Sequence, residues 1–206
     1  MLLRGRHARQ GRVNATSVQT QTHLLLASAA LGRSATRGEH AAILGGALLP
    51  DLSIFALAGW AAMRGVPGEV VWSQMYWAEP WQALSAVSNS VFVWGLVAAA
   101  GWAAKRRWLV LLGYAALLHV LFDLPLHADD AHRHFWPLSD RRFVSPVSYW
   151  DPAHHGRIAG LVEGAGGVAL CVVLWRRHAR RAIRALLVLL AAAYLAVPLF
   201  FALTLG

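Results

Sequence analysis

The sequence has few charged residues and a single cysteine. Only 14% of its 206 residues are charged, against about 25% in an ordinary globular chain. Hydrophobic residues make up 57% of the chain, and ten residues are Trp. This composition excludes an ordinary soluble domain, because much of the surface must face something other than water. The lone Cys171 excludes a disulfide framework and a zinc finger, so any bound metal must be held by His and carboxylate side chains.

A net charge of +9 raises the question of a nucleic-acid partner. The basic residues, however, lie in short clusters between apolar runs and form no continuous basic domain, which argues against nucleic acid. A helix needs about 20 apolar residues to cross a bilayer. Five stretches qualify: 41–63, 84–104, 108–126, 158–175 and 183–205. The sequence therefore predicts an all-α, polytopic membrane helix bundle with the lipid bilayer as its partner.

The basic clusters alternate with the predicted spans, and this alternation predicts an orientation. Arg33 and Arg37 precede the first span, Lys105 to Arg107 separate the second and third, and Arg176 to Arg184 separate the last two. Basic residues near span ends stay on the cytoplasmic side. We therefore expect loops 64–83 and 127–157 to face outward in a bacterial-type inner membrane, with the N-terminus cytoplasmic and the C-terminus outside.

The N-terminal region divides into two parts. Residues 1–17 are basic and polar, and we expect a disordered tail there, ahead of a single membrane domain over 18–206. Residues 22–32 are apolar but reach only about half the length of a span, which predicts an interfacial or re-entrant helix.

Four ionisable residues fall inside the predicted spans: Asp51, His119, Asp123 and Glu163. Such residues are expensive in a membrane and are functional candidates by default. The alternative is that they satisfy one another in the bundle interior. Glu163 is the candidate general base or an extra metal ligand.

Potential metal ligands are densest at the end of the third span. His119, Asp123 and His127 are spaced four apart, which places them on one helix face. Pro125 bends or ends this helix. The residues that follow add further imidazole and carboxylate groups: Asp129, Asp130, His132 and His134. This donor set suits a divalent metal, with zinc preferred and manganese or iron(II) as alternatives.

Two interpretations of this cluster of potential ligands remain open. It is either a metal site or a solvated polar loop whose side chains pair with neighbouring arginines. A metal ion with an open position activates water and polarises a phosphoryl or carbonyl oxygen, which predicts hydrolysis of a lipid-like or phosphoester substrate. Arg141 and Arg142 are either contacts for an anionic substrate or interfacial anchors. The same ligands also fit a non-enzymatic metal carrier, sensor or accessory protein.

Four short segments together resemble a known family: THLLLASAALG, GGALLPDLS, HVLFD and FWPLSDRRF. They are similar to the small inner-membrane proteins described as membrane-bound, metal-dependent hydrolases. That family's pattern has Gly-His or Thr-His, Leu-Pro-Asp-x-Asp, Thr-His-Ser, His-x-x-x-Asp and Trp-Pro, here spread over about residues 21–145. The resemblance implies metal-dependent hydrolysis, with metal ligands at His23, Asp51, His119 and Asp123.

The chain departs from this pattern at two places. Ser53 replaces the second Asp of Leu-Pro-Asp-x-Asp, and Ser88, Asn89 and Ser90 replace Thr-His-Ser. The segment HADDAHRH offers substitutes for the missing ligands. The chain is then either a divergent member with a rebuilt site or a scaffold that has lost the chemistry. In the rebuilt site, Asn89 is a candidate for orienting substrate or a ligand.

The resemblance also conflicts with the predicted orientation. The charge rule places His23 toward the cytoplasm and residues 127–134 on the opposite side. One metal joins them only if the 22–32 helix re-enters the bundle or if the charge rule misleads in this chain. The preferred ligands from sequence are Asp51, His119, Asp123, His132 and His134, with His127, Asp129 and Asp130 as alternates.

Overall fold

The computed structural model describes residues 19–149 and 151–205, with side chains described as far as residue 196. Within these ranges the chain is helical and contains no strand. The helices are α1 (Gln19–Leu31), α2 (Arg37–Leu48), α3 (Leu52–Met63), α4 (Gly68–Val70), α5 (Glu79–Ser88), α6 (Val91–Ala103), α7 (Arg107–Asp123), α8 (Gly156–Arg177) and α9 (Arg181–Leu205). The all-helical fold is therefore confirmed. The predicted tail, residues 1–17, lies outside the described residues.

Three helical segments are long and apolar enough to cross a membrane: Arg37–Met63, Arg107–Leu126 and Gly156–Arg177. A fourth span results if α5 and α6, which are bent by 42° relative to each other, count as one. Membrane insertion is thus plausible from the described residues, but the predicted number of five spans is not confirmed. The expected fifth span, 183–205, coincides with α9 and is not among these segments.

The distribution of side chains is that of a protein surrounded by lipid. Leu96, Trp102 and Leu161 are 71%, 81% and 71% exposed, whereas His119 and Asn89 are 1% and 2% exposed. Large apolar side chains at this exposure are unfavourable in water. In a bilayer they contact acyl chains, and the interior is left for polar groups, which are expensive in hydrocarbon.

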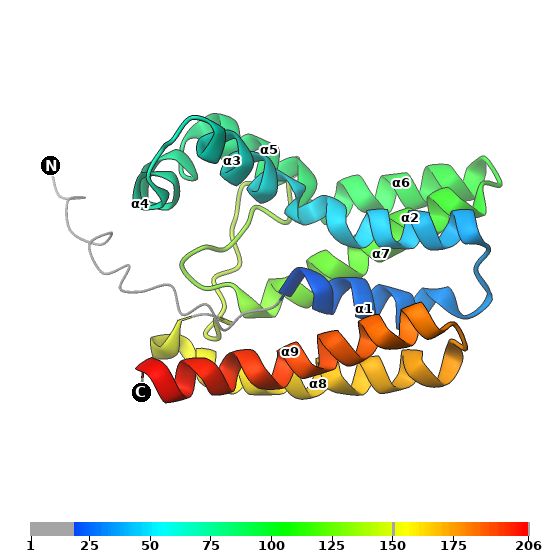
Figure 1. The fold of residues 1–206 in the computed structure, drawn as a ribbon. Helices are drawn as coiled ribbons and strands as arrows, with labels where there is room; N and C mark the ends of the chain where they lie inside the picture. The colour runs from blue at the N-terminus through cyan, green and yellow to red at the C-terminus, as the bar shows by residue number, and fades with distance from the viewer. Residues whose placement is uncertain (1–18, 150, 206) are drawn as a thin grey trace, which may run out of the picture.

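Helix α7 lies between α2 and α6 and contacts both along most of its length (Figure 1). Glycines permit this approach. A Cβ atom at Gly113 would lie 2.7 Å from the main-chain nitrogen of Ala98 on α6, and one at Gly46 on α2 would meet the carbonyl group of Leu112. Small residues let helix backbones approach closely in membrane proteins. Helices α2 and α6 therefore hold α7 in a fixed position between them.

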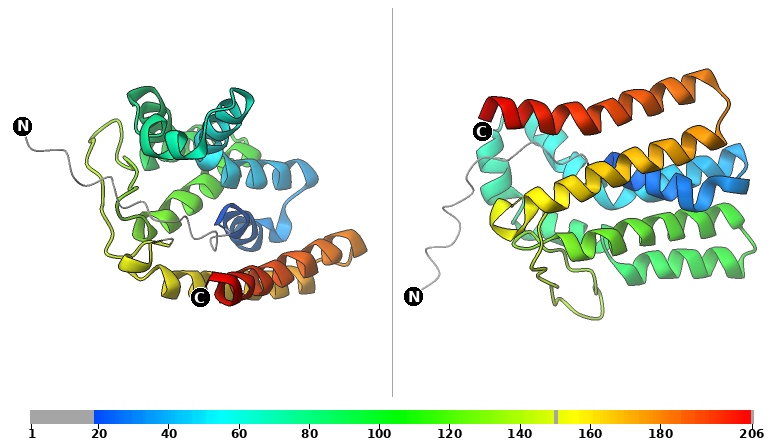
Figure 2. Two further views of the ribbon diagram at one scale, coloured as in Figure 1. Left: turned by 60° about the vertical axis from the view of Figure 1, so that its left-hand side comes forward. Right: turned by 90° about the horizontal axis from the view of Figure 1, so that it is seen from below.

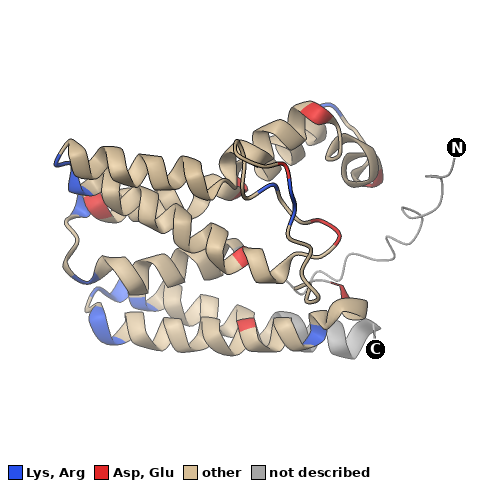
Figure 3. Ribbon diagram, turned by 180° about the vertical axis from the view of Figure 1, so that it is seen from behind, with Lys and Arg blue, Asp and Glu red and all other residues tan. Residues whose placement is uncertain are grey.

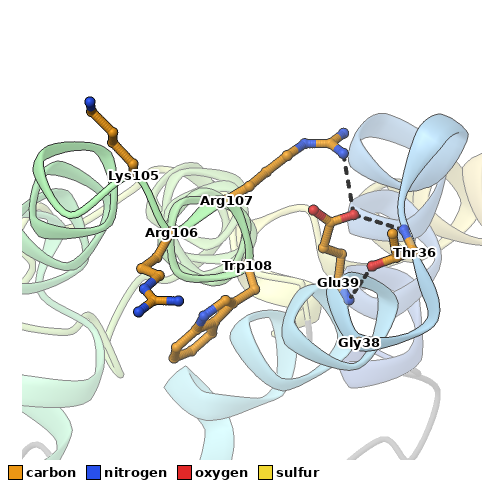
Figure 4. A pocket seen from close by; sticks show the side chains of 7 residues that line it. All are labelled: Thr36, Gly38, Glu39, Lys105, Arg106, Arg107 and Trp108. Atoms are coloured by element: carbon orange, nitrogen blue, oxygen red, sulfur yellow. Dashed lines mark hydrogen bonds and ion pairs between the residues drawn. The ribbon is translucent and has the colours of Figure 1, made fainter.

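The predicted basic clusters gather at one end of the bundle. The connections α1–α2, α6–α7 and α8–α9 all lie there, and Figure 3 shows Lys and Arg concentrated at these connections. Figure 4 shows Arg107 reaching across to Glu39, with an ion pair of 3.2 Å. Helix α9 returns to the opposite end, where α8 begins (Figure 2). We call these two parts of the molecule the basic end and the site end.

Helix α1 lies inside the bundle, as a re-entrant helix does. It packs against α2, α7 and α8, and Thr22 and His23 near its start are each only 3% exposed. The helix ends at the basic end, and its first turn lies deeper, toward the site end. His23 therefore reaches the same interior as α7, which is the condition for one metal to join it to the residues that follow α7. The polar side chains of the first turn fit this position, because they have polar partners there.

Candidate metal centre

Three buried side chains from two helices converge in the interior. His23 of α1 and His119 and Asp123 of α7 are 3%, 1% and 7% exposed. His23 Nε2 lies 2.9 Å from Asp123 Oδ1, and His119 Nε2 lies 3.1 Å from Asp123 Oδ2. One ligand atom from each residue lies within 4.8 Å of those of the other two. This triad could bind a metal ion.

The orientation of His119 suits metal binding. Its Nδ1 donates a hydrogen bond of 2.7 Å to the carbonyl oxygen of Ala47, which can only accept, and this bond turns Nε2 toward Asp123. Among the described residues, Nε2 has no hydrogen-bond partner despite its proximity to Asp123. A backbone carbonyl that holds the second nitrogen of a ligating His is a common outer-shell arrangement in metal sites.

Asp51 extends the triad from the 3-10 turn η2 (Leu49–Asp51), which separates α2 from α3. Its Oδ1 lies 3.5 Å from His119 Nε2. Its Oδ2 accepts a hydrogen bond of 2.6 Å from the hydroxyl of Thr20. Sequence reasoning missed Thr20, although residues 20–23 place four polar side chains on the first turn of an otherwise largely apolar helix.

A second group of histidines comes from the loop after α7. His127, His132 and His134 are buried, and their neighbouring ring centroids are 4.8 Å and 5.7 Å apart. His127 connects this group to the triad, because its Nε2 lies 3.7 Å from Asp123 Oδ2. Its Nδ1 lies 2.9 Å from Asp130. The structure thus brings together the predicted ligands on both sides of Pro125.

The loop histidines differ in the direction in which their pKa values are shifted. Burial disfavours the charged form of His127, but hydrogen bonds to Asp123 and Asp130 outweigh it and raise its pKa to about 10. Burial, together with the charges of His127 and His134, lowers the pKa of His132 to about 3. Burial also lowers the pKa of His134. His132 and His134 are therefore neutral near pH 7, as metal ligation requires.

Other predicted site residues lie away from the triad. Asp129 is exposed at the surface. Partial desolvation of its carboxyl and the negative charge of Asp130 raise its pKa. Glu163 on α8 accepts a hydrogen bond of 2.7 Å from Thr22, which also contacts the hydroxyl of Tyr194 at 2.6 Å. These contacts connect α1 to α8 and α9. They place Glu163 on the other side of α1 from the hydrogen bonds of Asp51.

Asn89 and Arg142 both hold the loop that follows α7. The side chain of Asn89 donates to the carbonyl of Ser85 at 3.1 Å, while its main-chain carbonyl lies 3.0 Å from His134 Nδ1. Asn89 thus orients a candidate ligand through its backbone. Arg142 donates to the carbonyl of Ala131 at 2.6 Å and to the side chain of Gln82 at 2.7 Å, so it anchors the loop to α5.

An apolar groove of about 830 Å³ lies beside the triad, between α1, α7 and α8. Leu121, Leu126 and Val162 are among its lining residues. Phe122, which also lines it, packs edge-on against His23 with the ring centroids 5.7 Å apart. One aromatic side chain therefore separates the groove from the candidate metal ligands.

No family model, curated protein or solved structure matches this chain. The arguments that follow therefore depend on the geometry of the site itself.

Proposed function

We propose that the protein is a metal-dependent hydrolase of a bacterial-type inner membrane that acts on a lipid-like or phosphoester substrate. The convergence of His23, His119 and Asp123 in the interior carries this proposal. The family resemblance names these three residues and Asp51 as ligands, and the four come from three separate elements that meet at one place. This agreement supports the resemblance as well as the metal site.

His23, His119, Asp51 and Asp123 would hold the metal, for which we propose zinc. A bound dication supplies Lewis acidity and a water molecule of lowered pKa. The two carboxylates differ in access, because the side chain of Asp51 is 18% exposed and that of Asp123 is 10% exposed. Thr20 holds the second oxygen of Asp51 and so orients this more accessible carboxylate toward the metal position. Asp123 orients both histidines.

The groove supports a lipid as the substrate class. Its lining is largely apolar, with Glu163, Thr22 and His155 among the residues that line it, and it lies between the candidate spans of α7 and α8, where acyl chains would be the surrounding medium. An acyl chain in the groove would bring the attached headgroup next to Phe122 and His23. The binding energy of the chain would thereby position a phosphoester near the candidate ligands.

The proposed topology follows from the basic end. With the connections α1–α2, α6–α7 and α8–α9 in the cytoplasm, as the charge rule requires, the triad lies toward the outer face. We propose that α9 makes the fifth crossing and that the chain ends outside.

Turnover by the detergent-purified full-length protein tests the function. With zinc or manganese added, we expect phosphate release from phospholipid mixed micelles or from a chromogenic phosphoester. His119→Gln should abolish turnover, and His178→Gln, a substitution at the basic end, should leave it unchanged. Equal turnover in the wild type and in His119→Gln would overturn the assignment of the site.

The burial of the triad favours one alternative, a non-enzymatic metal carrier, sensor or accessory protein. A site with ligands only 1–7% exposed resembles a closed structural site more than one with an open water position. This alternative predicts bound metal that depends on His119, without turnover of any phospholipid or phosphoester. That result would replace the hydrolase proposal.

A further inference from the structure

The loop histidines are arranged as a site of their own. His127, His132 and His134 are 5%, 4% and 1% exposed and follow α7 within a span of eight residues. The triad needs none of them, because it already has three ligand atoms close together. Three buried imidazoles beside a membrane boundary therefore require a separate explanation.

Each of these rings is held through the same nitrogen. The Nδ1 atoms of His127, His132 and His134 lie 2.9 Å from Asp130 Oδ2, 3.1 Å from Ser85 Oγ and 3.0 Å from the carbonyl oxygen of Asn89. Nε2 is therefore the nitrogen through which each ring would bind an ion, and at His127 the ion would displace a hydrogen from Nε2. Carboxylate, hydroxyl and carbonyl partners at the second ring nitrogen are the usual outer-shell support of metal-binding histidines.

His134 gives the strongest evidence. The carbonyl of Asn89 can only accept, so Nδ1 of His134 carries the hydrogen and Nε2 presents a lone pair. This Nε2 is buried and has no hydrogen-bond partner among the residues that the structure describes. A buried lone pair without a partner costs free energy, and a metal ion at Nε2 would satisfy it.

The ring centres of the loop histidines have the spacing of imidazoles on one ion. Metal–nitrogen distances of about 2.0–2.1 Å in tetrahedral geometry place imidazole ring centres roughly 5 Å apart. The observed centroid distances are 4.8 Å between His127 and His132 and 5.7 Å between His132 and His134. Among the described residues only the triad brings three ligand atoms within 4.8 Å of one another, so a bound ion would draw the nitrogens of the loop histidines closer together.

Asp123 lies between the two groups. Its Oδ1 faces His23 at 2.9 Å, and its Oδ2 lies 3.1 Å from His119 Nε2 and 3.7 Å from His127 Nε2. Two-metal sites hold their ions about 3.5–4 Å apart, a separation that a single carboxylate can bridge. The ion pairs of Asp51 and Asp123 are all with histidines in the described residues, so no Lys or Arg neutralises these two carboxylates.

We propose that the protein binds two divalent cations that share Asp123. His23, His119 and Asp51 complete the first site, and His127, His132 and His134 form the second. The inference rests on the triad site of the proposed function, but it does not require hydrolysis.

Metal counting on the full-length protein in detergent tests the proposal. The protein is stripped with a chelator, reloaded with zinc, desalted and analysed for its elements. We expect two zinc ions per chain in the wild type and one in His134→Gln. His178→Gln is the control, because this histidine lies at the basic end, and it should retain two. Loading with manganese adds a test by electron paramagnetic resonance. We expect the spectrum of two exchange-coupled ions in the wild type and the six-line signal of an isolated ion in His134→Gln.

His132→Gln serves as a second variant if His134→Gln does not fold, as judged by helical circular dichroism. One zinc ion or none in the wild type would overturn the inference, and so would two zinc ions in both variants. Two ions without turnover would overturn only the proposed function. Turnover with one ion would overturn only the second site.

Discussion

The two ends of the bundle treat charge in opposite ways. At the basic end Lys105, Arg106 and Arg177 are exposed, and the charge is nearly all of one sign. At the site end His119 and Asp123 are 1% and 7% exposed and contact each other. An exposed ion pair contributes about 0–1 kcal/mol, whereas breaking a buried pair costs about 3–5 kcal/mol. The basic end therefore keeps its charges in contact with solvent, whereas the site end contains buried polar groups whose desolvation is costly unless they bind something.

The largest expected effect comes from Asp123→Asn. The substitution keeps the shape of the side chain but removes the charge that faces His23, His119 and His127. Changes in the outer shell alone lower metal affinity by about 10–100-fold, so we expect a loss of more than about 100-fold here. Competition between the protein and a chromophoric chelator for zinc measures it.

The matched control for this substitution is Asp140→Asn. The side chain of Asp140 is 77% exposed and pairs with Arg133 in the loop after α7, so the change should leave zinc affinity within about twofold. Equal losses of zinc affinity in the two variants would mean that the buried and the exposed carboxylate contribute equally to zinc binding, and the contrast between them would fail.

The sequence predicted the local part of the site and missed the distant contacts. Four-residue spacing correctly placed His119 and Asp123 on one face of α7. His127 was expected on the same helix face, but it lies beyond the helix, after the 3-10 turn Leu124–Leu126, and reaches Asp123 at 3.7 Å from there. The positions of His132 and His134 depend on Ser85 and on the carbonyl of Asn89, which lie more than 40 residues away. No periodicity encodes such contacts, so the loop ligands could be named but not positioned.

The position of α1 shows the same limit. Its length correctly indicated less than a full span, but the charge rule reads only the flanking residues. What fixes the helix is the set of partners of its first turn: Asp51 for Thr20, Glu163 for Thr22 and Asp123 for His23. These partners come from η2, α8 and α7, and only the folded chain brings them together.

Thr20→Val sharpens the comparison by changing an outer contact of the site. The hydroxyl of Thr20 holds Asp51 Oδ2 at 2.6 Å, and valine keeps the shape without the donor. We expect zinc affinity to fall by about 10–100-fold, measured by the same chelator competition. Thr20→Ser retains the donor and should restore affinity. If Thr20→Val bound zinc like the wild type, Asp51 would need no support, and the role of α1 would reduce to His23.

The smallest effect is expected at the basic end, from Thr36→Ala. Thr36 caps α2: its hydroxyl accepts from the main-chain nitrogen of Glu39 at 3.3 Å, and the carboxylate of Glu39 accepts from the nitrogen of Thr36 at 2.7 Å. Loss of such a cap lowers the free energy of unfolding by about 1 kcal/mol. Thermal unfolding in detergent measures this change, and Thr36→Ser should reverse it. Zinc affinity should stay unchanged, because the cap lies at the opposite end of α2 from Ala47 and Asp51; a coupled loss of zinc would show that the two ends do not act independently.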